Sequence, residues 1–202
     1  MFDTGAELDA VTRHVRRDPE TVTVILRRNF AAPHDAVWDA LTDPEPLRAW
    51  FSPVTGDFHE GGSYQIEGNA SGEIWECRPR EHFMLTFGSQ ESLLTVELAY
   101  AGDDTTVQIT HGVPISMAGS GAGAFYVGPG WDGALLGLAM YLRGDEIGDP
   151  VEMADSAEII EFNKASIDRW QAVIEPSGTA DADEIAAGRE AAVQQFTMPG
   201  DR

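Results

Sequence analysis

The feature that most constrains this fold is a run of short alternating segments between Val54 and His111. Within each segment apolar and polar residues alternate, which is the period of a strand with one buried face. Glycine, proline or aspartate separates the segments, and none of the gaps is long enough to hold a helical crossover. Because parallel strands need such crossovers, the run predicts an antiparallel sheet. The expected strands cover residues 63–68, 73–78, 82–87, 94–100 and 107–111.

A further strand and two short helices are expected before this run. Along residues 21–30, side chains typical of a buried face alternate with more polar ones, and this pattern predicts a strand. A short helix over residues 35–42 follows, and a second one begins at Pro44, because proline is well tolerated in the first turn. Residues 1–20 fit helical spacing and strand alternation equally, so their structure stays ambiguous at this point.

A long apolar helix over residues 131–143 is expected after the last strand. It has almost no polar face, so we expect it to be buried against the sheet. The glycine-rich stretch 117–130 is expected to be a mobile loop. If this loop has a function, we expect it to act as a lid over the mouth of a cavity. Helices over residues 156–174 and 183–196 are expected to form an appended element.

The charge distribution argues against two classes of partner. The chain has 13 basic and 34 acidic residues, a net charge of −21, and residues 145–202 alone hold 14 acidic and 4 basic residues. A surface this acidic repels the phosphates of nucleic acids and anionic lipids, so we expect neither nucleic acid nor membrane as a partner. The acidic tail is most simply a solvated surface, and its alternative role is to bind a protein partner.

The sequence also predicts a cytoplasmic location. No apolar run approaches the ~20 residues that cross a bilayer. The first residues lack the basic and apolar segments of a secretion signal. Cys77 is the single cysteine, which fits a reducing compartment.

Several short motifs resemble one known family. The segment VWDALTDP at residues 37–44, followed by WFSP at residues 50–53, looks like the opening of the family related to activators of the 90-kDa heat-shock-protein ATPase. This family belongs to the START-like superfamily of polyketide cyclases, lipid-transfer proteins and birch-pollen-allergen-like proteins. Gly61-Gly62, Gly72, Pro79 and the segment that starts at Gly130-Trp131 also match, so the resemblance covers about residues 22–143.

The resemblance implies an α+β helix-grip fold. In this fold a curved antiparallel sheet wraps on a long buried helix, with two short helices after the first strand and a six-stranded meander between them and the long helix. The order predicted from the residues agrees, and a helical C-terminal extension follows. We therefore expect an N-terminal extension (1–20), a START-like domain (21–144) and an acidic helical extension packed on the same domain (145–202).

The superfamily implies a cavity between the sheet and the long helix, typically used for an apolar ligand. It does not fix one reaction, because its members include enzymes, carriers and cochaperones. Our leading hypothesis is a non-catalytic or weakly catalytic protein that binds a small hydrophobic ligand. The alternatives are a cyclase- or aromatase-like enzyme that uses the same cavity, and a stress-related or cochaperone-like interaction protein.

The expected ligand-binding residues are large side chains whose faces would line this cavity. They are Trp50, Phe51, Tyr64, Ile66, His111, Trp131, Leu135 and Leu138. His111 is the one candidate for catalysis, because an imidazole on the inward strand face could orient a ligand or transfer a proton. In the enzyme hypothesis Tyr64 would share this proton transfer. The alternative for His111 is a buried histidine that bonds to a neighbour.

No motif predicts a metal or a cofactor. Residues 119–124 fit the pattern G-x-G-x-x-A, but a dinucleotide site needs a parallel βαβ unit that this sequence does not predict. The histidines and Cys77 do not fall at metal-ligand spacing. Glu73 and Glu76 are expected on opposite faces of their strand, so they would not form an inward carboxylate pair.

Overall fold

The structure, a computed structural model, describes residues 2–198 apart from the side chains of residues 151 and 152. The described strands are β1 Val11–Arg17, β2 Thr21–Phe30, β3 Val54–Gly56, β4 Ser63–Ile66, β5 Ser71–Arg78, β6 His82–Thr86, β7 Leu93–Ala101 and β8 Asp104–Pro114. The described helices are α1 Thr4–Asp9, α2 His34–Thr42, α3 Pro44–Trp50, α4 Ile115–Ala118, the 3-10 turn η1 Gly121–Gly123, α5 Ala124–Arg143, α6 Pro150–Met153, α7 Ala157–Ser177 and α8 Ala182–Thr197.

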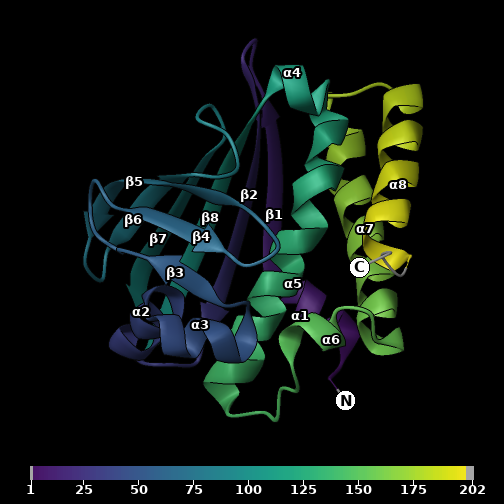
Figure 1. The fold of residues 1–202 in the computed structure, drawn as a ribbon. Coiled ribbons are helices and arrows are strands. Elements are labelled where there is room, and N and C mark those ends of the chain that lie inside the picture. The colour runs from purple at the N-terminus through teal and green to yellow at the C-terminus, as the bar shows by residue number, and fades with distance from the viewer. Residues whose placement is uncertain (1, 199–202) are drawn as a thin grey trace.

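The strands form one antiparallel sheet in the order β1-β2-β8-β7-β6-β5-β4-β3. Figure 1 shows the sheet curving around one side of α5, while α7 and α8 cover the other side of this helix. The helix-grip prediction is therefore confirmed, including the meander from β3 to β8. Among the described residues, no helix is both long and apolar enough to cross a bilayer.

The two short helices follow β2 as predicted. Pro44 occupies the first turn of α3, where its missing N–H has no helical partner to lose. The Asp43 side chain accepts a hydrogen bond from the Glu45 N–H and caps the same helix. Trp50 ends α3, and its indole Nε1 donates to the Ala40 carbonyl of α2 at 2.9 Å. This bond fixes the angle between the two helices.

The ambiguous residues 1–20 contain α1 and an edge strand. β1 pairs with β2 from Val11 opposite Arg28 to Arg17 opposite Val22. Val11 and Val15 are buried on its inner face. β1 thereby extends the main sheet by one strand and contacts α7.

The prediction of a mobile loop or lid over residues 117–130 is wrong. This stretch contains α4, η1 and the beginning of α5, which starts at Ala124 rather than at Trp131. Its glycines allow neighbouring elements to pack closely. A Cβ atom at Gly121 would lie 1.8 Å from Thr179 Oγ1, and one at Gly128 would lie 2.3 Å from Trp170 Cε2. These positions need glycine because neighbouring elements touch the backbone directly.

Two smaller expectations are also corrected. α7 continues through Pro176 to Ser177, and Gly178 caps it in the left-handed conformation at a φ of 68°. In β5 a bulge between Ile74 and Glu76 shifts the alternation by one residue. Glu73 and Glu76 are therefore both exposed on the outer face, and neither points inward.

We predict that Gly128→Ala destabilises the protein because of the contact between α5 and α7. The new methyl group would overlap the Trp170 indole, which is fully buried, so the free energy of unfolding should fall by ~1–3 kcal/mol. The matched control is Gly133→Ala in the same helix, where a Cβ atom meets nothing within 4 Å. This control should raise stability by up to ~1 kcal/mol through helix propensity. Urea denaturation of both variants checks the prediction, and equal stabilities would contradict it.

Candidate functional site

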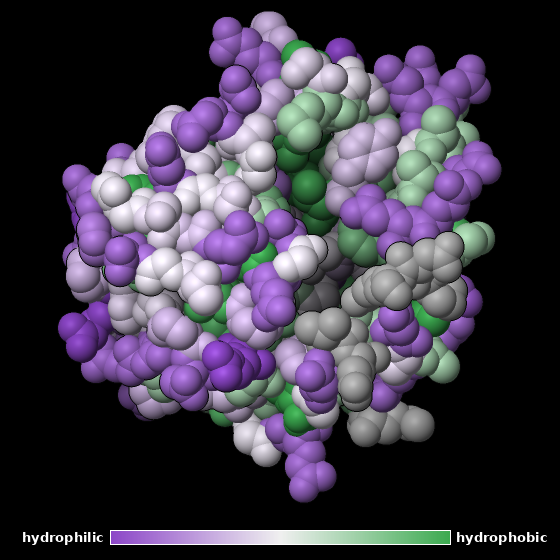
Figure 2. All heavy atoms as spheres, in the orientation of Figure 1, coloured by the Kyte–Doolittle hydropathy of each residue, from purple (hydrophilic) through white to green (hydrophobic). Residues whose placement is uncertain are grey.

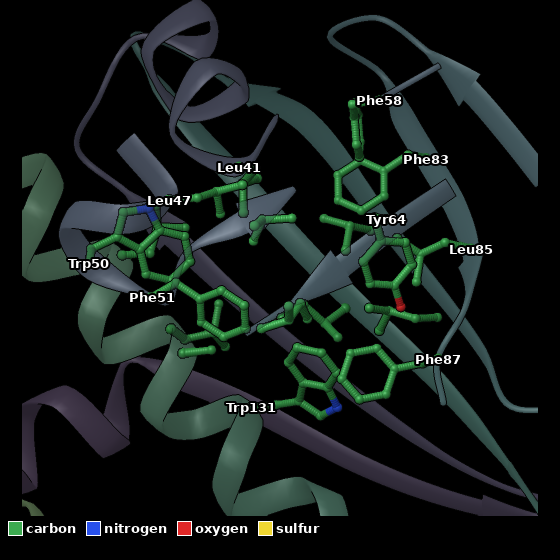
Figure 3. Close-up of a pocket in the computed structure, with 18 residues that line it drawn as sticks. Leu41, Leu47, Trp50, Phe51, Phe58, Tyr64, Phe83, Leu85, Phe87 and Trp131 are labelled. Carbon is green, nitrogen blue, oxygen red and sulfur yellow. The ribbon is translucent and has the colours of Figure 1, made fainter. Parts of the chain in front are cut away.

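An apolar pocket lies between the inner face of the sheet and α5 (Figure 3). Its volume is about 100 Å³. The residues around it are Leu41, Leu47, Trp50, Phe51, Val54, Phe58, Tyr64, Ile66, Phe83, Leu85, Phe87, Leu94, Val96, Ile109, Trp131, Ala134, Leu135 and Leu138. In the space-filling view, apolar residues lie at the base of a hollow between the sheet and the helices (Figure 2).

Strand and helix periodicity place these side chains. Tyr64 and Ile66 are the two buried positions of β4, and Phe83 and Leu85 repeat the pattern in β6. The helix contributes Trp131, Ala134, Leu135 and Leu138, whose spacing of three and four residues puts them on one face of α5. Residues far apart in the sequence thus meet because each element buries its apolar face.

Seven of the eight residues expected in the site border the pocket: Trp50, Phe51, Tyr64, Ile66, Trp131, Leu135 and Leu138. Their contact with a ligand stays a prediction. The sequence reasoning missed Phe87 and Phe58 as site residues. Phe87 had a usable signal, because it shares a strand face with Phe83 and Leu85. Phe58 lies in the irregular segment between β3 and β4, where no periodicity indicates a buried position.

The polar atoms of the pocket residues are bonded within the protein. Trp50 donates to the Ala40 carbonyl, as described above. The Tyr64 hydroxyl donates to the Thr86 carbonyl at 2.7 Å, and the Trp131 indole Nε1 donates to His111 Nδ1 at 3.0 Å. Burial also raises the pKa of the Tyr64 phenol well above its ordinary value, so this group stays protonated. The surface that the pocket offers to a ligand is therefore apolar.

His111 is the exception among the expected site residues. It is fully buried in β8 and does not line the pocket, because the rings of Trp131 and Phe87 pack against it and take that place. Ser92 Oγ lies 2.9 Å from its Nε2 atom. This is the alternative that the sequence left open, a buried histidine that bonds to its neighbours.

The hydrogen bonds of His111 define its tautomer. An indole N–H can only donate, so Nδ1 accepts from Trp131 and the proton of the neutral ring lies on Nε2. The imidazole then donates to Ser92, which is the reverse of the bond that a histidine base makes to a serine nucleophile. Burial lowers the pKa of His111 to about 4, which keeps the ring neutral. In this arrangement His111 holds the Trp131 indole in the pocket wall.

A second polar cluster lies on the opposite side of α5. Asp132 is buried, and its carboxylate accepts bonds from Arg13 Nε of β1 at 3.0 Å. Ser166 Oγ and Trp170 Nε1 of α7 donate to the same carboxylate at 2.6 and 3.0 Å. Burial raises the pKa of Asp132, and these donors act against that effect. The cluster joins β1, α5 and α7.

The described side chains offer no cluster for a metal ion. Across residues 2–198, leaving aside the side chains of residues 151 and 152, no group of three or more histidine, cysteine, aspartate or glutamate side chains is placed to hold an ion. The Asp132 cluster holds one carboxylate, and its Arg13 guanidinium supplies the positive charge.

Comparison with solved structures supports the fold. CalU16 from Micromonospora echinospora is 31% identical in its solution structure, with a TM-score of 0.70 over 84% of this chain and 97% of that one. Its crystal structure is 30% identical, with a TM-score of 0.67 over 82% and 99%. EF2215 from Enterococcus faecalis shares the fold at 12% identity, with a TM-score of 0.62 over 84% and 95%. No curated protein matches the chain.

The family comparison agrees with the element order. The model described as Activator of Hsp90 ATPase homolog 1-like protein matches residues 31–143, from the end of β2 to the end of α5. This range is more than half of the 202 residues. The chain therefore belongs to the Activator of Hsp90 ATPase homolog 1-like family of the START-like superfamily, whose fold indicates a ligand-binding or polyketide cyclase-like protein.

Proposed function

We propose that the protein binds a small apolar molecule in the pocket between the sheet and α5. The observation that carries the proposal is the pocket wall, whose side chains are apolar or have their polar atoms bonded within the protein. A ligand that displaces water from such a wall gains affinity from apolar burial alone. A polar ligand would lose its hydrogen bonds to water without replacement.

The volume of the pocket limits the ligand that it admits. It measures about 100 Å³, whereas a designed apolar cavity of ~150 Å³ holds benzene and pockets for drug-sized ligands start near ~300 Å³. The pocket in this form therefore suits a compact apolar group of a few heavy atoms.

We predict that Val54→Trp blocks binding because it fills the pocket from the edge of the sheet. Val54 borders the pocket in β3, the outermost strand, where a larger side chain disturbs few neighbours. The variant should weaken binding of xenon, a compact apolar probe, at least tenfold, as measured by xenon NMR titration. The control is Thr55→Trp, which adds the same indole at the next, exposed position on the other strand face. Xenon binding should be unchanged in this control; a similar loss in both variants would remove the pocket as the binding site.

The enzyme alternative has less support from the geometry. A general acid or base must reach the ligand, directly or through one water. The Tyr64 hydroxyl already donates a hydrogen bond to the Thr86 carbonyl. His111 is separated from the pocket by Trp131 and Phe87. A cyclase-like reaction would therefore depend on preorganising a folded substrate rather than on proton transfer by these two residues.

The interaction-protein alternative relied on the acidic C-terminal helices. α7 contributes the fully buried side chains of Ile167, Trp170 and Ile174 to the main core. Its primary contribution is therefore to the fold, and its acidic residues lie on the remaining, more exposed faces. A partner that binds those faces is compatible with the proposed ligand binding but is not needed for it.

A further inference from the structure

A second cavity lies on the other side of α5 from the pocket. Its volume is about 230 Å³. The residues around it are Trp50, Phe51, Pro129, Gly130, Gly133, Ala134, Leu136, Gly137, Met140, Ile147, Pro150, Met153, Ala154, Ile159, Asn163 and Phe196. They come from α3 and the residue after it, from α5, from α6 and the residues on either side of it, and from α7 and α8, so this cavity lies between the long helix and the C-terminal helices.

Three residues line both cavities: Trp50, Phe51 and Ala134. The two spaces are therefore separated by a partition that is one side chain thick. Of these three, Trp50 is held by its bond to the Ala40 carbonyl, and Ala134 belongs to the long helix. Phe51 follows the last residue of α3 and is only half-buried. Phe51 is thus the member of the partition that can rotate without breaking a hydrogen bond.

Small residues of α5 keep the second cavity open next to this partition. A Cβ atom at Gly133 would meet nothing within 4 Å, so empty space adjoins the helix backbone there. One turn later, a Cβ atom at Gly137 would lie 2.8 Å from the Trp50 carbonyl oxygen. Gly137 therefore lets the end of α3 rest directly on α5, while Gly133 leaves room beside it.

The two cavities complement each other in size. Each is smaller than the ~300 Å³ at which pockets for drug-sized ligands begin, and joined they exceed it. A flexible chain could therefore fill both spaces where a compact ligand would fill only one.

The lining also restricts the polar end of such a chain. Among the described lining residues of both cavities there is no charged side chain, so no lysine or arginine is present to pair with a carboxylate. The net charge of −21 further disfavours an anionic ligand. Asn163 brings a carboxamide to the second cavity, and its Nδ2 atom donates to the Phe196 carbonyl at 2.8 Å. This environment suits an uncharged polar end.

We propose that the ligand is an unbranched apolar chain with an uncharged polar end, which passes the Phe51 partition and occupies both cavities. This inference rests on the proposed function and specifies its ligand class. The apolar end lies in the pocket against the sheet, and the polar end lies in the second cavity with Asn163. Entry to the second cavity requires rotation of the Phe51 side chain.

The test is a binding series of 1-alkanols from butanol to decanol, measured by isothermal titration calorimetry. In the wild-type protein the affinity should rise about fourfold for each added methylene across the whole series. In Gly133→Leu the new side chain fills the open space, so the rise should stop at the shorter alkanols. The matched control is Gly5→Leu in α1, an exposed helical glycine that lines neither cavity.

Each outcome separates the inference from the proposed function. A wild-type affinity that stops rising at short chains, or a rise that continues unchanged in Gly133→Leu, would overturn the two-cavity ligand while leaving the pocket proposal intact. Absence of binding by every alkanol and by xenon would overturn both. If Gly133→Leu does not fold, as judged by circular dichroism, the wild-type series alone decides.

Discussion

Asp132→Asn is expected to lower the free energy of unfolding by ~3–5 kcal/mol, because it removes the counter-ion of a buried guanidinium. Arg13 Nη2 lies 2.8 Å from Asp132 Oδ1, and the two side chains are 5% and 0% exposed. The new amide would also present N–H groups toward a site where Ser166 and Trp170 already donate. The loss is a large part of the ~5–15 kcal/mol that stabilises an ordinary domain.

The control for this prediction is Asp145→Asn. Asp145 pairs with Arg143 at 2.9 Å, but both side chains are more than 40% exposed, so the change should cost less than ~1 kcal/mol. Urea denaturation of both variants at neutral pH gives the comparison. A cost below 1 kcal/mol for Asp132→Asn would mean that the carboxylate is not the required partner of Arg13.

The stability of the wild-type protein is expected to fall by ~2 kcal/mol between pH 7.5 and pH 5 through His111 alone. Burial lowers its pKa from 6.5 to about 4 in the folded state. Between these values the unfolded chain binds a proton that the folded protein does not, so stability is complete above pH 6.5 and decreases as the pH falls. Protonation would also turn Nδ1 into a donor that faces the Trp131 N–H.

The measurement is the difference in unfolding free energy between the wild type and His111→Gln at several pH values. Carboxyl groups titrate in both proteins, so their contributions cancel in the difference. The series stays above pH 5 because the isoelectric point is about 4.3, where solubility is lowest. Parallel curves for the two proteins would show that His111 does not lose a proton on folding.

The sheet and its inward faces could be predicted from the sequence because burial of one face imposes a period of two. That period placed Tyr64 and Ile66 correctly on the pocket wall. For His111 the same period correctly predicted a side chain on the inward face. It could not predict that other side chains lie between His111 and the pocket. His111 pairs with Leu94 and Val24, and the aromatic rings of Phe87, just after β6, and Trp131 of α5 separate it from the cavity. Which inward residues reach a cavity depends on neighbours that the period does not identify.

The glycine-rich stretch could not be predicted for a different physical reason. A glycine permits both flexibility and close packing, and the sequence around it does not distinguish them. The partners that decide between them, Trp170 and Thr179, lie in and after α7, far along the chain. Asp132 carried a usable signal that the sequence reasoning did not use, because it is the one acidic residue of an otherwise apolar helix. Its partner Arg13 lay in the segment whose structure was ambiguous.

The hydrogen bonds of Asp132 also determine when the fold can be completed during synthesis. The carboxylate joins Arg13, which leaves the ribosome early, to Ser166 and Trp170, which leave it late. A nascent chain that ends before Ala157 contains the whole sheet and α5 but lacks α7, the helix that buries the back of α5. Because contacts between such distant residues form slowly, this intermediate exposes the glycine-lined face of α5 until α7 arrives. Chaperones that act on the nascent chain would therefore meet this face of α5 before α7 covers it.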